Sequence, residues 1–423
     1  MEINKYFIIT FGCQINYSDS ERIAGFLESN KYKKTIKMED ANLIIVNMCS
    51  IRQSAVDRVY GLKQKFKGLN NIQTILTGCI LKKDRRKFKD FFDFILDIKD
   101  LPNWFTILNS KQKKPNKKYY LDINPRYSLP KIAYIPISNG CNNFCAYCVI
   151  PYTRGPLVNR KAKDIIKEAE SLIKNNYKEI WLLGQNVNSY QGTLSSKKIN
   201  FPKLLKLINN IPGDFWIRFT SSNPKDFSDS LINVMAKSKK ITPYLNLPLQ
   251  SGNNEILKKM NRKYTVEKYK NIIKKIREKI PNIVLSTDII VGFPGETKKQ
   301  FNDTAKVVKE IEFDMIYISK YSTRSETKAV KMEDNISEKE KKEREKILNE
   351  ILKKTLAKKN KKYIGKIIKV LPIKWEKGFL NTKSFDYKSV KIKESKILLG
   401  QFINVKINSS FPWGLEGCIK KTN

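Results

Sequence analysis

Apolar positions along the chain alternate between two periods, one typical of buried strands and one typical of amphipathic helices. In the first part of the chain, the predicted elements are strands at Tyr6–Thr10, Leu43–Val46 and Ile72–Leu76 and a helix opened by a capping box of Ser18 and Glu21. Strands that alternate with helices form parallel sheets. Residues 1–125 are therefore predicted to fold as an α/β domain with a doubly wound parallel sheet.

The same alternation continues over residues 126–356, after a polar, lysine-rich segment at 110–130 that is predicted to be a linker or exposed loop. The predicted strands are Ile132–Ile137, Ile180–Leu183, Phe215–Phe219, Tyr244–Leu247, Ile283–Val291 and Met315–Ile318, with helical patterns at 161–175, 265–280 and 337–360. Six strand–helix units predict a partial barrel related to the eight-unit barrel, and closure by further units stays open.

Residues 357–423 have a third pattern. Short alternating runs at Lys366–Val370 and Phe402–Ile407 are separated by glycines, which is typical of a small all-β domain. Residues 361–423 contain 14 lysines against 4 acidic residues and no arginine. This β module is therefore predicted to bind RNA, and a solvated surface is the alternative.

The net charge of the chain indicates a class of binding partner. The chain has 82 Lys and Arg residues against 41 Asp and Glu residues, a formal net charge of +41. Such an excess predicts nucleic acid as a partner, with a genomic bias toward Lys, Asn and Ile as the alternative. No apolar stretch approaches the roughly 20 residues of a membrane span, and the apolar run near the N-terminus is interpreted as a strand, not a signal peptide. A cytoplasmic protein without a membrane partner is therefore expected.

The chain contains seven cysteines and no histidine. An odd number of cysteines in a large chain of this kind argues against a disulfide framework. Without imidazole, general acid–base catalysis by histidine is excluded, and metal chemistry depends on thiolates and oxygen ligands. Closely spaced thiolates favour zinc or an iron–sulfur cluster.

The densest cysteine motif is GCNNFCAYC, with Cys141, Cys145 and Cys148 directly after a predicted strand. Three thiolates can hold three irons of a four-iron cluster and leave the fourth open, where the amino and carboxylate groups of S-adenosylmethionine can chelate. Electron transfer then yields a deoxyadenosyl radical. A zinc site with a distant fourth ligand is the alternative, but no second CxxC pair exists. Tyr147 is placed to pack against the nucleotide, or is a core aromatic.

A second set of cysteines is dispersed in sequence. Cys13, Cys49 and Cys79 each follow a predicted parallel strand, and the carboxyl ends of such strands line one crevice. The three thiolates are therefore predicted to converge on a second four-iron cluster with an open iron, although free cysteines are often small buried hydrophobes. Cys418, alone in the β module, is predicted to be structural.

Together these motifs resemble the radical S-adenosylmethionine methylthiotransferases over essentially the whole chain. The similar segments are TFGCQINYSDSE, IVNMCSIRQSA and TGC for the N-terminal cluster, GCNNFCAYCVIPYTRG for the radical cluster, and a C-terminal part that resembles a TRAM RNA-binding module. LLGQNVNSY at 182–190 and CSIR at 49–52 are most similar to the branch of the family that acts on dimethylallyl-adenosine in tRNA.

The resemblance implies a reaction. An adenosine beside the anticodon, with a dimethylallyl group on its exocyclic nitrogen, would receive a methylthio group at carbon 2. Two four-iron clusters would serve it, and S-adenosylmethionine would supply both the radical and the methyl group. The partners implied are tRNA, a sulfur donor and a reductant of unidentified kinds, and the chain is expected to be a monomer.

Further site residues follow from position in this family. Gly184 and Gln185 are expected near the methionine part of the cofactor and Gly292 near its adenine, with turns as the alternative for the glycines. Arg154 and Arg160 are expected to meet a phosphate or the cofactor carboxylate, or to be surface charges. The chain departs from the family in having Asn223 and Asn246 where histidine is frequent and Ser325-Glu326 where Pro-Gly is common. These changes bear on proton transfer and substrate positioning.

Two other functions compete with this one. Other branches of the family act on threonylcarbamoyl-adenosine in tRNA or on a ribosomal protein, and the LGQNVNSY segment argues against both by resemblance. A non-catalytic RNA-binding protein with structural zinc would also suit the basic charge and the β module.

Overall fold

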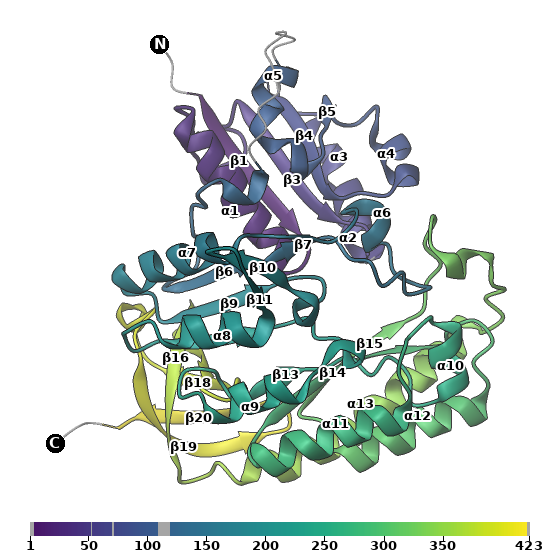
Figure 1. Cartoon of the computed structure of the whole chain (residues 1–423). Coiled ribbons are helices and arrows are strands. Elements are labelled where there is room, and N and C mark those ends of the chain that lie inside the picture. The colour runs from purple at the N-terminus through teal and green to yellow at the C-terminus, as the bar shows by residue number, and fades with distance from the viewer. Residues whose placement is uncertain (1–3, 52, 70–71, 109–118, 421–423) are drawn as a thin grey trace.

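The computed structural model describes residues 4–51, 53–69, 72–108 and 119–420. Figure 1 shows an N-terminal α/β domain above two neighbouring sheets, with a small β-barrel and a long helix on the opposite side. Part of the predicted linker, residues 109–118, lies outside the described residues.

The N-terminal domain is built on a five-stranded parallel sheet of order β2-β1-β3-β4-β5. Its strands are β1 (Lys5–Phe11), β2 (Lys33–Lys34), β3 (Leu43–Cys49), β4 (Gln73–Cys79) and β5 (Phe94–Ile95). Its helices are α1 (Gln14–Ser29), α2 (Gln53–Tyr60), α3 (Leu62–Phe66), α4 (Lys82–Phe88) and α5 (Trp104–Leu108). Separate apolar cores form on the two faces of the sheet, one against α1 and the other against α2 and α3, which confirms the doubly wound arrangement.

The predicted start of the first helix is wrong, because α1 begins at Gln14 and not near Ser18. The Asn16 side chain accepts a hydrogen bond from the Cys13 backbone N–H at 3.2 Å and so satisfies the entry to the helix. Ser18 and Glu21 lie inside the helix and are buried. Glu21 instead accepts hydrogen bonds from the backbone N–H and hydroxyl of Ser128, which ties α1 to the chain that enters the second domain.

The second domain contains all six predicted strands, arranged as two parallel three-stranded sheets of order β12-β9-β6 and β13-β14-β15. The strands are β6 (Ile132–Pro136), β9 (Glu179–Leu183), β12 (Trp216–Phe219), β13 (Tyr244–Asn246), β14 (Val284–Val291) and β15 (Met315–Lys320). A backbone bridge between Ile217 and Ile241 joins the sheets, and one apolar core runs under both. The partial barrel is confirmed, with six strands among the described residues.

Helices cover the outside of this partial barrel. They are α7 (Ala162–Lys174), α8 (Phe201–Asn209), α9 (Asp229–Lys237), α11 (Val266–Lys279) and α12 (Lys298–Ile311). Shorter elements lie in the loops: α6 (Ile150–Thr153), α10 (Asn254–Lys259), and the pairs β7 (Ser138–Asn139) with β8 (Val158–Asn159) and β10 (Gln191–Leu194) with β11 (Lys197–Asn200). The predicted helical patterns at 161–175 and 265–280 correspond to α7 and α11.

The long helix α13 (Glu338–Lys361) packs along α12 and β15 and leads into the C-terminal β module. The module is a closed five-stranded barrel with the cyclic order β16-β17-β18-β20-β19. Its strands are β16 (Ile367–Glu376), β17 (Phe379–Ser384), β18 (Ser389–Lys393), β19 (Ile403–Phe411) and β20 (Gly414–Ile419). Because the ring is closed, the module leaves no free strand edge within the described chain.

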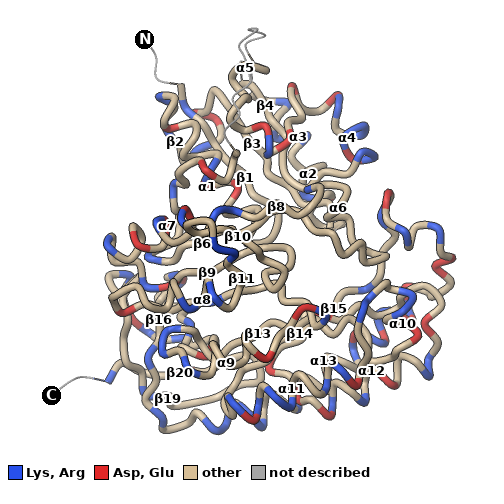
Figure 2. The backbone as a smooth tube through the Cα atoms, in the orientation of Figure 1, with Lys and Arg blue, Asp and Glu red and all other residues tan. Residues whose placement is uncertain are grey.

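Figure 2 shows lysines and arginines along all parts of the chain, with acidic residues interspersed on the outer helices α11 and α13. The basic excess is therefore not confined to the β module. None of the helices within the described ranges is long and apolar enough to cross a membrane.

Candidate active site

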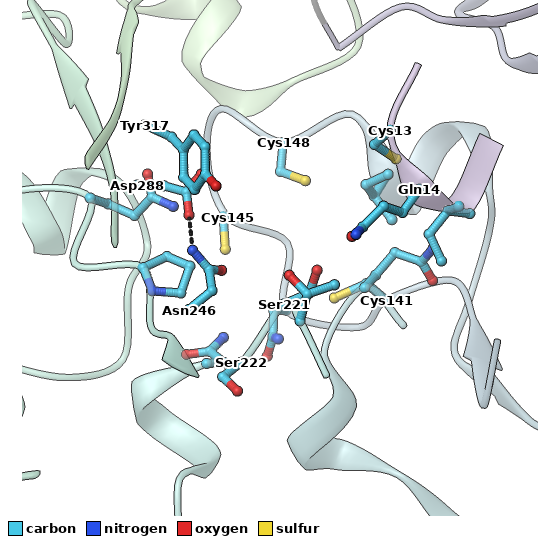
Figure 3. A pocket seen from close by; sticks show the side chains of 18 of the residues that line it. Cys13, Gln14, Cys141, Cys145, Cys148, Ser221, Ser222, Asn246, Asp288 and Tyr317 are labelled. Carbon is cyan, nitrogen blue, oxygen red and sulfur yellow. Dashed lines mark hydrogen bonds between the residues drawn. The ribbon is translucent and has the colours of Figure 1, made fainter. Parts of the chain in front are cut away.

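A cavity of about 420 Å³ lies where the N-terminal domain meets the partial barrel. Cys141, Cys145 and Cys148 line it from the loop after β7, and Cys13 lines it from the N-terminal domain. Figure 3 shows the three sulfurs of the loop facing a common space, with Asp288 and Tyr317 across from Cys13 and Gln14. The two predicted thiolate sets therefore open onto the same cavity through Cys13.

Backbone contacts fix the loop that carries the first set. Gly140 has a φ of +82°, and a β-carbon there would lie 2.0 Å from the Pro156 carbonyl oxygen, so this position requires glycine. Phe144, between two of the cysteines, has a φ of +47°, and its carbonyl accepts a hydrogen bond from the Asn261 side chain at 2.9 Å. Ala146 N–H donates to the Met260 carbonyl at 2.9 Å. The segment after α10 thus holds the loop in a strained conformation.

The electrostatics of this loop favour a cationic group between the sulfurs. Burial, followed by the charges of Cys145 and Cys141, raises the pKa of the Cys148 thiol to about 12. Arg262 donates a hydrogen bond to Cys145 Sγ at 3.4 Å. Deprotonation of Cys148 therefore needs further positive charge, which bound iron would supply when the thiolate becomes a ligand.

The separation of the three cysteine side chains limits which kind of metal group the loop can bind. In the described part of the chain, no three His, Cys, Asp or Glu side chains converge closely enough to hold a single metal ion. A four-iron cluster makes a different demand, because each thiolate binds a different iron. Cys141, Cys145 and Cys148, which line one cavity without closing on one point, fit such a group.

The second thiolate set is brought together by the N-terminal sheet. Cys49 and Cys79 are the last residues of the adjacent parallel strands β3 and β4 and are partners in register. Cys13, at the start of α1 just after β1, lies within electrostatic reach of both. A hydrogen bond from Cys49 and the charge of Arg154 lower the pKa of the Cys79 thiol, against the effect of burial. The predicted convergence at three strand ends is observed, and the donor set suits iron.

Two asparagines lock these strand ends together. The Asn16 amide donates to Asn47 Oδ1 at 3.0 Å, and the Asn47 amide donates to the Asn16 carbonyl at 2.8 Å. A β-carbon at Gly12 would lie 2.3 Å from Asn16 Oδ1, and one at Gly78 would lie 2.5 Å from Asn47 Oδ1. The glycine before Cys13 and the glycine before Cys79 therefore make room for the asparagine pair. No local sequence signal marks either asparagine, because their contact joins residues 31 positions apart.

The two arginines after the radical loop are neither surface charges nor free to meet a phosphate, so that expectation is wrong. Arg154 is buried and donates to Cys79 Sγ at 3.0 Å. Arg160 is also buried and pairs with Glu168 at 2.8 Å. Both guanidinium groups are used inside the protein.

Of the residues predicted to bind the cofactor, Tyr147 and Gln185 line the cavity, whereas Gly184 and Gly292 are not among its described lining residues. Local packing accounts for the absence of a side chain at each of these two glycines. A β-carbon at Gly184 would lie 2.8 Å from Ser138 Oγ, and one at Gly292, where φ is +69°, would lie 2.4 Å from Lys341 Cγ. The structure thus explains both glycines by packing, and their predicted contact with the cofactor stays a prediction.

Asn223 and Asn246 both line the cavity. The Asn246 amide donates to Asp288 Oδ2 at 3.1 Å (Figure 3), and Asn223 Oδ1 accepts from the Lys225 backbone N–H at 3.1 Å. Both amides therefore have structural partners at positions that sequence analysis associated with proton transfer. Asp288 supplies the carboxylate of this wall. It begins the segment DIIVGFPGE, and a single carboxylate within a strand carries no spacing signal of its own.

Comparisons with known proteins agree with this geometry. The sequence profile of the Radical SAM superfamily matches residues 135–308, and that of the Uncharacterized protein family UPF0004 matches residues 5–97. The fold is similar to that of the radical S-adenosylmethionine methyltransferase TsrM from Kitasatospora setae, with a TM-score of 0.51 at 13% identity over 75% of this chain and 73% of that one. The cobalamin-dependent radical enzyme OxsB has a TM-score of 0.51 at 11% identity, over 84% of this chain and 56% of that one.

Curated relatives match along nearly the whole chain. Two of them are named tRNA-2-methylthio-N(6)-dimethylallyladenosine synthase. The protein from Clostridium botulinum strain Langeland is 40% identical over 98% of this chain and 97% of that protein. The protein from Fusobacterium nucleatum is 39% identical over 98% of this chain and 99% of that protein. With this identity along its whole length and a cysteine loop within the matched superfamily region, the chain belongs to the tRNA-2-methylthio-N(6)-dimethylallyladenosine synthase family of radical S-adenosylmethionine proteins.

Proposed function

We propose that this chain replaces the hydrogen at carbon 2 of N6-dimethylallyladenosine in tRNA with a methylthio group, as the names of its relatives describe for those proteins. The observation that carries the proposal is the single cavity onto which Cys141, Cys145, Cys148 and Cys13 all open. A radical formed on one side of this cavity can reach a substrate that also faces a sulfur source on the other side. The C–H bond at carbon 2 is unreactive, so radical activation is required before sulfur can be inserted.

Cys141, Cys145 and Cys148 would hold the four-iron cluster that cleaves S-adenosylmethionine to a deoxyadenosyl radical. Tyr147 and Gln185 line the cavity beside these cysteines, where they can pack against and hydrogen-bond the cofactor. A small apolar cluster separate from the barrel core, with Ala146, Met260 and Phe293 among its buried residues, packs behind the loop and shields it from water. These side chains position the cofactor and protect the radical.

Cys13, Cys49 and Cys79 would hold a second four-iron cluster, which would carry the sulfur for insertion. The asparagine pair Asn16–Asn47 joins the start of α1 to β3, and the ladder between β3 and β4 holds Cys79 beside Cys49. Because Cys13 alone of this set lines the cavity, we propose that sulfur passes to the substrate on the Cys13 side.

The β module would bind the tRNA. Its barrel is closed and lysine-rich, and it presents exposed aromatic residues, Trp375, Phe411 and Trp413, that can stack on bases. We retain 1–125, 126–356 and 357–423 as the proposed domain boundaries. The proposed substrate implies a cytoplasmic location.

Metal content and product analysis test the proposal. After anaerobic reconstitution we expect about eight irons per chain, from two four-iron clusters, and release of deoxyadenosine from S-adenosylmethionine. Cys145→Ala should abolish that release, whereas Cys418→Ser, which removes an exposed cysteine of the β module, should retain both iron and activity. One zinc and no iron would contradict the proposal and support the structural-zinc alternative.

The substrate is tested with prenylated tRNA. The reconstituted protein should convert N6-dimethylallyladenosine to its 2-methylthio derivative, detected by mass analysis of nucleosides. A threonylcarbamoyl-adenosine tRNA, offered in parallel, should remain unmodified. Modification of the second tRNA alone would overturn the choice of substrate but leave the radical chemistry intact.

A further inference from the structure

Arg154 crosses between two domains to reach a cysteine. It follows α6 in the radical domain, yet its Nε donates a hydrogen bond to Sγ of Cys79, on the N-terminal sheet, at 3.0 Å. Arg154 is 3% exposed and Cys79 is 1% exposed. The contact is therefore a buried, charge-assisted hydrogen bond to sulfur, screened little by solvent.

The rest of the guanidinium is fixed as firmly. Its Nη2 donates to Asp19 Oδ2 at 2.6 Å, and its Nη1 donates to Asn139 Oδ1 at 3.0 Å. Asp19 comes from α1 and is fully buried, and Asn139 belongs to β7 beside the radical loop. Bonds on three sides leave the guanidinium one orientation, so its Nε–H is directed at the sulfur by the fold and not by chance.

We infer that Arg154 is a positioning residue for the group held by Cys13, Cys49 and Cys79, and that it raises the reduction potential of that group through the hydrogen bond to Cys79 Sγ. The inference rests on the second cluster of the proposed function. A cationic donor next to a ligand sulfur stabilises the more negative, reduced state of an iron–sulfur cluster, and such hydrogen bonds are among the factors that set cluster potentials.

The origin of Arg154 gives the inference a second consequence. The donor belongs to the radical domain, whereas the three cysteines belong to the N-terminal domain. The reduction potential of the second cluster is therefore linked to correct docking of the two domains. A displaced radical domain would withdraw the donor and leave the cluster harder to reduce.

Arg160 provides a matched control. It lies six residues further on, is similarly buried at 6% exposed, and forms an ion pair with Glu168 and a hydrogen bond to the Pro136 carbonyl at 2.9 Å. Both arginines thus neutralise a carboxylate inside the protein. Arg154 has in addition a bond to a cysteine sulfur.

The test is a redox titration of the second cluster alone, in the full chain with Cys141, Cys145 and Cys148 replaced by Ala. Arg154→Met is combined with Asp19→Leu, so that no buried carboxylate is left without a partner. We expect the midpoint potential of this double variant to shift to a more negative value, with unchanged iron content. Arg160→Met should leave the potential where it is.

Arg154→Lys decides the question if the double variant does not fold, because lysine keeps a positive charge beside Asp19 but lacks the fork that also reaches Cys79. Its potential should shift in the same direction, with the same iron content as the parent protein. Equal potentials in the parent and both Arg154 variants would overturn the inference. A parent protein that binds no iron at all would instead contradict the proposed function.

Discussion

Arg218, in β12, is a buried link between the partial barrel and the β module. It forms an ion pair with Glu179 at 2.7 Å and donates to the carbonyls of Ser384 and Phe385 at 2.8 and 2.9 Å. The guanidinium is fully buried, and Tyr387 covers it with its ring centroid 4.8 Å away. Since Tyr387 also lines the cavity, this link connects the β module to the site.

We predict that Arg218→Met strongly destabilises the docking of the β module. Loss of one partner from a buried ion pair costs about 3–5 kcal/mol, because the remaining carboxylate of Glu179 is left buried and uncompensated. For a folding unit of roughly 150 to 250 residues this corresponds to a fall of about 6–20 °C in melting temperature. Arg218→Met combined with Glu179→Gln should recover most of the loss, since glutamine still accepts the hydrogen bond from Trp181 Nε1.

Scanning calorimetry of the full chain measures the effect, and limited proteolysis reports release of the β module. Lys369→Met is the control, because Lys369 pairs with Asp214 across the same interface at 2.7 Å but with both side chains exposed to solvent. Such a pair contributes at most about 1 kcal/mol. If Arg218→Met lowers the melting temperature no more than Lys369→Met, the buried pair does not hold the module and the reasoning is refuted.

Three further predictions concern single positions. Gly78→Ala should lower the free energy of unfolding by at least about 2 kcal/mol and reduce iron content, because φ is +108° and the new β-carbon would lie 2.2 Å from a backbone oxygen. The control Gly68→Ala, where the new β-carbon would meet open space, should change the melting temperature little. Glu326→Gly should destabilise the protein less than Glu326→Ala does. The φ of +71° at this position costs a residue with a β-carbon about 1–2 kcal/mol, and glycine avoids that cost. Both variants lose the hydrogen bond from the Lys82 backbone N–H. Burial, aided by Arg218, lowers the pKa of Lys383 from 10.5 to about 8. Between these values the unfolded chain binds more protons, so the free energy of unfolding should rise with pH, and Lys383→Met should flatten that rise in denaturant titrations.

Each of these predictions has a contradicting result. Equal melting temperatures for Gly78→Ala and Gly68→Ala would show that the strand end adapts to a side chain. A Glu326→Gly variant less stable than Glu326→Ala would mean that left-handed strain at that residue is negligible. A pH slope above 8 that is the same in the wild type and Lys383→Met would place the titrating group elsewhere.

Local patterns were sufficient for the main strands of the two α/β domains. All six strands of the partial barrel and the N-terminal strands β1, β3 and β4 follow from short apolar runs between helical patterns, because burial on both faces of a parallel sheet leaves a continuous apolar signal. The edge strands β2 and β5 have two residues each and are too short to give such a signal. The error at the start of α1 has an equally local cause. Ser18 and Glu21 have the spacing of a capping box, but they serve tertiary hydrogen bonds to Tyr134 and Ser128 instead.

The sequence by itself was sufficient to predict two sets of three cysteines, since their positions after apolar strand patterns can be recognised without knowledge of packing. The tertiary structure decided which side chains support them. The contacts of Asn16 with Asn47, and of Arg154 with Cys79 and Asp19, join residues that are 31 to 135 positions apart along the chain. Contacts of that separation leave no periodic trace in a single sequence, because they are created only when separate elements pack together. The meeting of both cysteine sets at one cavity is a property of the domain arrangement for the same reason.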